Sequence, residues 1–274
     1  MKKIIVPIDF SEHSEYALKT AAILAQKHNA EILALHMLEL SNAVLTSATD
    51  SQQSETVFYL KLAEKRFSSF LDKSYLKNIK VTPIVKHFKV FSEVNEVAAE
   101  NGADLIVMGS HGTDGLKEIF VGSNAEKVVR NADIPVLVIK QEIKNFKVDR
   151  FAFACDFQEE SLGAFQKAKQ FAELLSAELE LVYINTPGDD FLSHKDAYDR
   201  INRFLTDANV GRQVEVYNDY SVEKGILNYS ETINADIIGI PTHGRKGLSH
   251  FFMGSIGEDV SNHSQIPVVT FKIG

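Results

Sequence analysis

The feature that most constrains the fold is an internal repeat. The segment KIIVPIDFSEHSEYALKTAAILAQKHNAEILALHM, which starts at Lys3, aligns without gaps with RFAFACDFQEESLGAFQKAKQFAELLSAELELVYI, which starts at Arg150. A second pair of segments, ADLIVMGSHGTDGLKEIFVGSNAEKVVRNADIPVLVI and ADIIGIPTHGRKGLSHFFMGSIGEDVSNHSQIPVVTF, aligns in the same way. Self-similarity over most of the length indicates one structural unit that occurs twice. We therefore expect two tandem domains, at residues 1–141 and 149–274, with a junction near residues 141–149.

Within each repeat, apolar runs rich in β-branched residues alternate with segments of helical periodicity. Alternating strands and helices predict an α/β fold with a parallel sheet that helices cover on both faces. Ligands bind such a sheet beyond the carboxyl ends of its strands, where the strand order reverses. The elements predicted for the first repeat are strands at 3–8, 31–37, 80–88, 104–109 and 135–140, and helices near 14–28, 55–76, 92–101 and 123–132.

The Ser- and Thr-rich stretch at residues 41–56 shows no periodicity and is expected to be a loop beside the strand ends. We favour a solvated connection over a lid.

Charge and the amino terminus exclude several classes of protein. The 29 Lys and Arg residues against 37 Asp and Glu give a formal net charge of -8, which repels polyanions, so we expect no nucleic-acid partner. The opening MKKIIVPIDF contains too short an apolar run for a signal peptide or a membrane span. The single cysteine, Cys155, lies in the apolar run FAFAC and is expected to be a packed thiol rather than a nucleophile. Together these features predict a cytoplasmic protein.

A glycine-rich loop follows the fourth predicted strand of each repeat. It reads GSHGTDGLKEIFVGS from Gly109 in the first repeat and PTHGRKGLSHFFMGS from Pro241 in the second. Glycines such as Gly109 and Gly112 allow positive φ and a close approach to a ligand. Gly122 and the residue after it then open a helix, whose first N–H groups carry the positive end of the macrodipole and can bind phosphate. The alternative is that the glycines form ordinary turns before an ordinary helix.

The spacing Gly109-x2-Gly112-x9-Gly122-Ser123, with the VPIDFSEHSEYAL opening and the ADLIVMGSHG run, resembles the universal stress protein family over both repeats. The resemblance implies two Rossmann-like domains (flavodoxin-like or adenine nucleotide alpha hydrolase-like), each with a five-stranded parallel sheet of order 3-2-1-4-5. It also implies a bound ATP or AMP, which Mg²⁺ could accompany, and a role in stress response. The residues that it implies for adenine, ribose and phosphates are Pro7, Ile8, Asp9, Met37, Met108, Gly109, His111, Gly112, Gly122, Ser123 and Asn124.

Several of these side chains have an alternative structural role. Asp9 could cap the helix that follows it, and Met37 and Met108 could be plain core residues. His111 has no second His, Cys or paired carboxylate at ligand spacing, so we expect no metal site there. We expect this histidine to form a hydrogen bond locally or to phosphate.

Motifs of several common catalytic loops do not occur in the sequence. The P-loop spacing, a GxGxxG that opens a helix after the first strand and the GxSxG nucleophile elbow are missing, so we predict no catalytic residue. A nucleotide-binding signalling module, whose ligand shifts a conformational or assembly equilibrium, is the leading hypothesis. The alternatives are a scaffold that binds no nucleotide and acts through an unidentified protein partner, and a slow ATP hydrolase.

Two further features set expectations for the arrangement of the repeats. Pro241 stands where the first repeat has Gly109, and it lacks an N–H and fixes φ, so we expect a weakened or empty second site. The predicted fifth strands, IPVLVIK and IPVVTFK, are apolar and would be exposed edges if unpaired. By the resemblance, these edges pair the two domains as an internal pseudo-dimer, and a dimer between chains is a further option.

Overall fold

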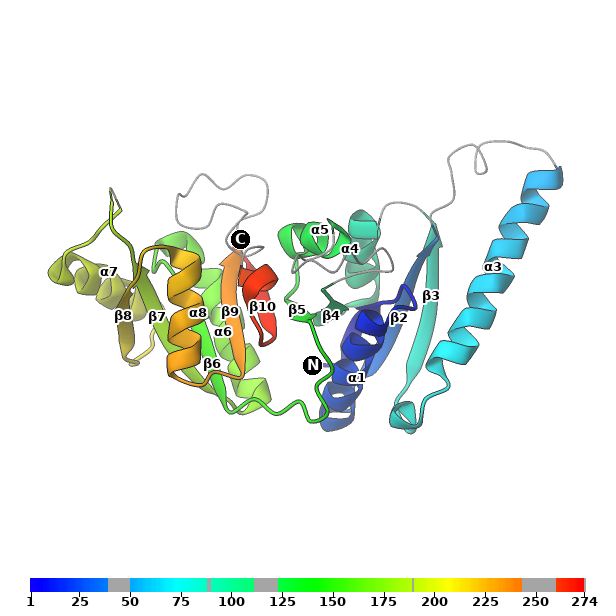
Figure 1. Ribbon diagram of the computed structural model, residues 1–274, viewed down its shortest axis with the longest axis horizontal. Helices are drawn as coiled ribbons and strands as arrows, with labels where there is room; N and C mark the ends of the chain where they lie inside the picture. The colour runs from blue at the N-terminus through cyan, green and yellow to red at the C-terminus, as the bar shows by residue number, and fades with distance from the viewer. Residues whose placement is uncertain (39–49, 88–89, 111–122, 189, 243–259, 274) are drawn as a thin grey trace.

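A computed structural model describes residues 1–38, 50–87, 90–110, 123–188, 190–242 and 260–273. Its strands form one ten-stranded sheet of order β3-β2-β1-β4-β5-β10-β9-β6-β7-β8 (Figure 1). The strands are β1 (Lys3–Pro7), β2 (Glu31–Leu38), β3 (Val81–His87), β4 (Leu105–Gly109), β5 (Val136–Ile139), β6 (Arg150–Ala154), β7 (Glu178–Asn185), β8 (Val214–Asn218), β9 (Ile237–Thr242) and β10 (Val268–Lys272).

A helix lies between each pair of consecutive strands from β1 to β5 and from β6 to β9, as the alternating pattern predicted. They are α1 (Glu12–His28), α3 (Asp50–Leu71), α4 (Val90–Asn101), α5 (Ser123–Asn131), α6 (Leu162–Leu175), α7 (His194–Asp207) and α8 (Val222–Thr232), with single 3-10 turns at η1 (Ser74–Leu76) and η2 (Glu159–Ser161). None of the helices in the described residues is long and apolar enough to span a membrane.

Alternate residues of the central strands supply two separate cores in the first half. Ile4 and Val6 belong to a cluster with Leu18 of α1, whereas Ile5 belongs to a second cluster with Val97 of α4. Successive side chains of a strand point to opposite faces of a sheet. Helices therefore cover both faces, and the prediction of two α/β domains is confirmed.

The two halves join through their fifth strands. All pairings within each half are parallel, but β5 and β10 pair antiparallel, with Val138 opposite Val268 and Val136 opposite Thr270. An ion pair of 2.6 Å between Lys272 Nζ and Asp133 Oδ1 also crosses this junction. The two apolar strands that would otherwise be exposed edges thus pair with each other.

One predicted helix has different bounds in the structure. The helix expected near residues 55–76 begins at Asp50 and ends at Leu71, and a separate 3-10 turn follows at Ser74–Leu76. The expectation of a loop over residues 41–56 is therefore wrong from residue 50 onward, and residues 41–49 lie outside the described residues. The polar residues that open this helix lack the apolar periodicity by which a helix is predicted from sequence.

Candidate functional site

The ladder between β1 and β4 stops before either strand ends, which opens the carboxyl edge of the sheet. Its register contains only the pairs Ile4–Leu105 and Ile5–Ile106. The N–H of Ile8 donates to Leu35 of β2, so the N–H groups of odd-numbered β1 residues face β4. The next odd position is Pro7, which has no N–H and cannot extend the ladder.

In the second half the ladder between the equivalent strands, β6 and β9, continues one residue further than the ladder between β1 and β4. There β6 and β9 form three pairs, ending at Phe153–Gly239, and Ala154 stands at the position of Pro7. Alanine retains the N–H that proline lacks. The first and fourth strands therefore separate one residue earlier in the first half, and this crevice between them lies at the reversal of strand order, where such sheets bind ligands.

Asp9 lies at the rim of this crevice, directly after β1. Its Oδ1 accepts hydrogen bonds from Ser11 N at 2.9 Å and from Ser11 Oγ at 2.5 Å. Ser11 is the N-cap of α1, and its Oγ accepts from Ser14 N at 3.2 Å. The suggestion that Asp9 itself caps the helix is thus wrong, because Asp9 orients the serine that does so. Within the described residues Asp9 Oδ2 accepts no hydrogen bond.

Aromatic side chains pack against Phe10, the residue that follows Asp9 in this turn. Phe10 has φ of 65°, and its ring centroid lies 4.6 Å from that of His36 and 5.5 Å from those of Phe67 and Phe70. His36 Nδ1 donates to the carbonyl of Ile8 at 2.7 Å, and burial lowers the pKa of this histidine. Sequence reasoning missed His36; the available signal was a histidine inside an apolar strand.

In the equivalent turn of the second half the aspartate is shielded from solvent. Phe157 repeats the left-handed backbone with φ of 54°, but the Asp156 side chain is fully buried. Its Oδ1 accepts from Ser161 Oγ at 2.7 Å and from Gln158 N at 3.1 Å, while its buried Oδ2 has no partner among the described residues. Asp9, by contrast, is partly exposed.

The remaining apolar residues of the implied set lie against the core. Ile8 is 3% exposed and Met108 is 5% exposed, and Met108 belongs to the cluster beneath α4 and α5. Met37 is partly buried against the same cluster, and Pro7 is partly buried at the end of β1. The structure thus brings Pro7, Ile8, Asp9, Met37 and Met108 to one end of the sheet, with most of the apolar surface facing inward.

Position 109 requires glycine because there is no space for a Cβ, and not because of positive φ as expected. Positive φ occurs at only two glycines of the described residues, Gly102 and Gly188, so the prediction of a left-handed Gly109 is wrong. A Cβ at Gly109 would lie 2.7 Å from the backbone C and O of His13, so its close approach is to α1. The N–H of Ser110 donates to Ile139 of β5, which directs the Gly109 N–H toward the crevice beside β1.

Part of the implied site cannot be placed. His111, Gly112 and Gly122 lie outside the described residues, while Ser123 and Asn124 form the start of α5. Because α5 leads from the carboxyl end of β4 back to β5, its N-terminus lies at the same rim as Asp9. An α-helix N-terminus there offers unpaired N–H groups to an anion.

Neither a metal centre nor a reactive thiol is evident in the part of the chain that the structure describes. No group of three His, Cys, Asp or Glu side chains there could hold a metal ion. Cys155 is buried, and burial raises the pKa of its thiol, which keeps it protonated and unreactive.

Comparisons with known proteins agree with the two-domain architecture. The model of the Universal stress protein family matches residues 1–140 and again residues 147–272. Universal stress protein MJ0577 of Methanocaldococcus jannaschii is 32% identical over 157 residues, which cover 52% of this chain and 96% of the relative. Universal stress protein MJ0531 of the same organism is 32% identical over 143 residues, covering 52% and 84%. A crystal structure of a universal stress protein from Archaeoglobus fulgidus has a TM-score of 0.68 at 23% identity and covers 99% of this chain and 96% of its own.

Proposed function

The chain belongs to the universal stress protein family, and from this premise we propose that its first half binds an adenine nucleotide, ATP or AMP. Occupancy of this site regulates a partner protein during stress response. The observation that carries the proposal is the crevice between β1 and β4, where Pro7 ends the ladder and where Asp9 Oδ2 accepts no hydrogen bond from the described residues.

Each part of the crevice matches a part of the ligand. The Asp9 carboxylate can accept hydrogen bonds from the ribose hydroxyls or the adenine amino group. The N-terminus of α5, with Ser123 and Asn124, and the N–H of Gly109 face the phosphates, as do His111, Gly112 and Gly122 of the glycine motif. Met37 and Met108 border the base. Mg²⁺, where present, would bind through phosphate oxygens rather than through a protein cage.

We assign this binding to a domain at residues 1–141 and propose that the domain at residues 149–274 has a degenerate site. Two features of the second half oppose binding. Asp156 is buried, and Pro241 removes the N–H that Gly109 supplies. Losing one hydrogen bond to a charged group costs about 1.5–3 kcal/mol, or roughly ten- to hundredfold in affinity.

The proposal concerns binding in the cytoplasm, not catalysis, and we assign no catalytic residue. Calorimetry on protein stripped of nucleotide should give about one AMP or ATP per chain. Asp9→Asn keeps the acceptor for Ser11 but replaces the free oxygen by an amide donor, so we expect about tenfold weaker binding or more.

A matched pair of variants tests which half binds. Gly122→Val should abolish binding, and Gly254→Val, its counterpart in the second repeat, should leave affinity within about twofold. Two equal sites, or loss of binding with Gly254→Val alone, would place the site in the wrong half. Stripped protein that binds neither nucleotide would favour the scaffold function instead.

A further inference from the structure

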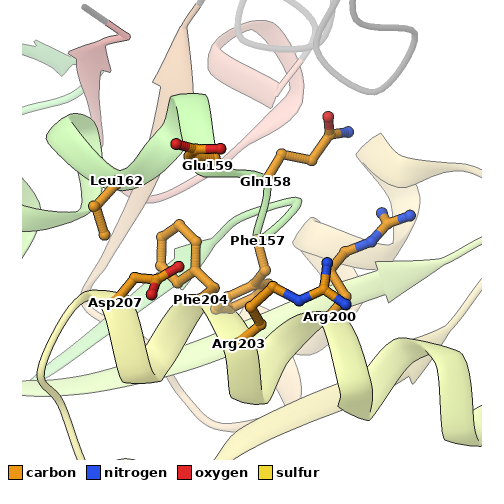
Figure 2. A pocket seen from close by; sticks show the side chains of 8 residues that line it. All are labelled: Phe157, Gln158, Glu159, Leu162, Arg200, Arg203, Phe204 and Asp207. Atoms are coloured by element: carbon orange, nitrogen blue, oxygen red, sulfur yellow. The ribbon is translucent and has the colours of Figure 1, made fainter.

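A pocket of about 340 Å³ opens in the second half, between the turn after β6 and helix α7 (Figure 2). The rings of Phe157 and Phe204 and the side chain of Leu162 form its apolar wall, and charged side chains surround its mouth. Asp156 does not line it, and the pocket lies on the side of the sheet that α6 and α7 cover. It is therefore separate from the nucleotide crevice of the first half.

A comparison of the halves explains why this space is open. Phe157 and Phe204 meet with ring centroids 5.3 Å apart, as Phe10 and Phe67 do at 5.5 Å. In the first half a second aromatic residue, three positions after Phe67, also packs edge-on against Phe10. Three positions after Phe204 the chain has Asp207, which lines the pocket. A carboxylate thus replaces the ring that fills the equivalent space.

Two arginines of α7 border one side of the pocket. Arg200 and Arg203 are three residues apart, so they share a helix face, and Figure 2 shows both guanidinium groups on the same side of the opening. In the described part of the chain neither forms a hydrogen bond or ion pair; Arg200 has a ring contact, 6.0 Å above Tyr183. Two guanidinium groups that have no carboxylate partner among the described residues are suited to bind a phosphate, because each presents a planar fork of donors.

The acidic side chains lie apart from the arginines. Figure 2 shows Asp207 and Glu159 on the opposite side of the pocket, and neither forms an ion pair with Arg200 or Arg203. Carboxylates accept hydrogen bonds from hydroxyl groups but repel a second anion. One side of the pocket is therefore suited to a dianion and the other to hydroxyl donors. Its volume lies near the lower limit for small-molecule sites.

We propose that this pocket binds a phosphate monoester of a polyhydroxylated compound, of the sugar phosphate type. The phosphate contacts Arg200 and Arg203, the hydroxyl groups donate to Asp207 and Glu159, and the carbon skeleton lies against Leu162. This site is independent of the nucleotide site, so each can fail without the other.

Calorimetry at constant ionic strength tests the site with glucose 6-phosphate, inorganic phosphate and glucose as probes. We expect glucose 6-phosphate to bind more tightly than inorganic phosphate, and glucose to bind more weakly than either. Arg200→Ala and Arg203→Ala should each weaken binding of glucose 6-phosphate about tenfold or more. Lys195→Ala removes one positive charge from the same helix outside the pocket, and it should change the affinity less than about twofold.

Asp207→Phe supplies the aromatic ring of the first half and should abolish binding by filling the pocket. Circular dichroism confirms that each variant is folded, and retained AMP binding shows that the first half is intact. Absence of binding by both phosphate probes to the unmodified protein would overturn the proposal. Affinity in Arg200→Ala and Arg203→Ala that equals that of the unmodified protein would also overturn it, as would a loss of binding with Lys195→Ala as large as that expected for the arginine variants.

Discussion

Replacing Gly109 by alanine measures how tightly β4 packs against α1. An added Cβ would lie 2.7 Å from the backbone C and O of His13 and 2.8 Å from its Cβ. These atoms belong to the helix backbone and its first side-chain atom, so they cannot rotate away as the end of a long side chain could. Either α1 or β4 must shift, and overpacking of this kind costs about 1–3 kcal/mol of the free energy of unfolding.

Thermal unfolding followed by circular dichroism should detect this loss. At about 2–4 °C for each kcal/mol in a chain of this size, we expect Gly109→Ala to lower the melting temperature by roughly 2–12 °C. Gly163→Ala is the matched control, because a Cβ at Gly163 meets no atom within 4 Å. Alanine in a helix gains up to about 1 kcal/mol over glycine, so the control should not be destabilised. Equal stability of the two variants would show that contact with α1 is not what requires glycine at position 109.

Two further predictions concern the junction and the turn after β1. Val268 is 1% exposed and pairs with Val138, so Val268→Asp buries an unpaired charge and should destabilise the junction by about 3 kcal/mol or more. Small-angle scattering of this variant should show a larger radius of gyration than that of the unmodified protein. An unchanged radius would contradict the prediction. Burial lowers the pKa of His36 below its ordinary value of about 6.5, so the unfolded chain takes up the proton first and stability falls as the pH drops below that value. Urea unfolding at pH 7.5 and pH 5 should show a smaller loss in His36→Phe, and an equal loss in both proteins would refute the assignment.

The sequence predicted the strands well because their apolar, β-branched runs are bounded by turn residues. The first strand was expected at residues 3–8 and is found at Lys3–Pro7, and the fourth was expected at 104–109 and is found at Leu105–Gly109. The start of α3 was not predicted, because its first turns are polar and carry no apolar stripe. Helix propensity without periodicity leaves little signal in a single sequence.

For two residues of the candidate site the sequence did not predict the structural role. Pro7 was expected only as a ligand contact, yet it also ends the β1–β4 ladder, and that effect depends on which neighbour each N–H faces. Gly109 was expected to need positive φ, whereas its requirement comes from His13 on another element. The arginine-lined pocket could not be predicted either, because it depends on an aromatic ring that is absent from a packing partner distant in sequence.

The antiparallel pairing of β5 with β10 has a consequence for how such a protein responds to dilution. Two separate domains that met through these strands would dissociate as their concentration fell, but covalent connection makes the encounter intramolecular, with an effective concentration fixed by the linker. The two unlike halves are also always present in equal number. With both apolar edges used internally, β3 and β8 end the sheet that the described residues form. β3 carries an exposed proline, Pro83, which discourages a further strand from pairing there. Assembly beyond a single chain would therefore have to use a surface other than the one that joins its halves.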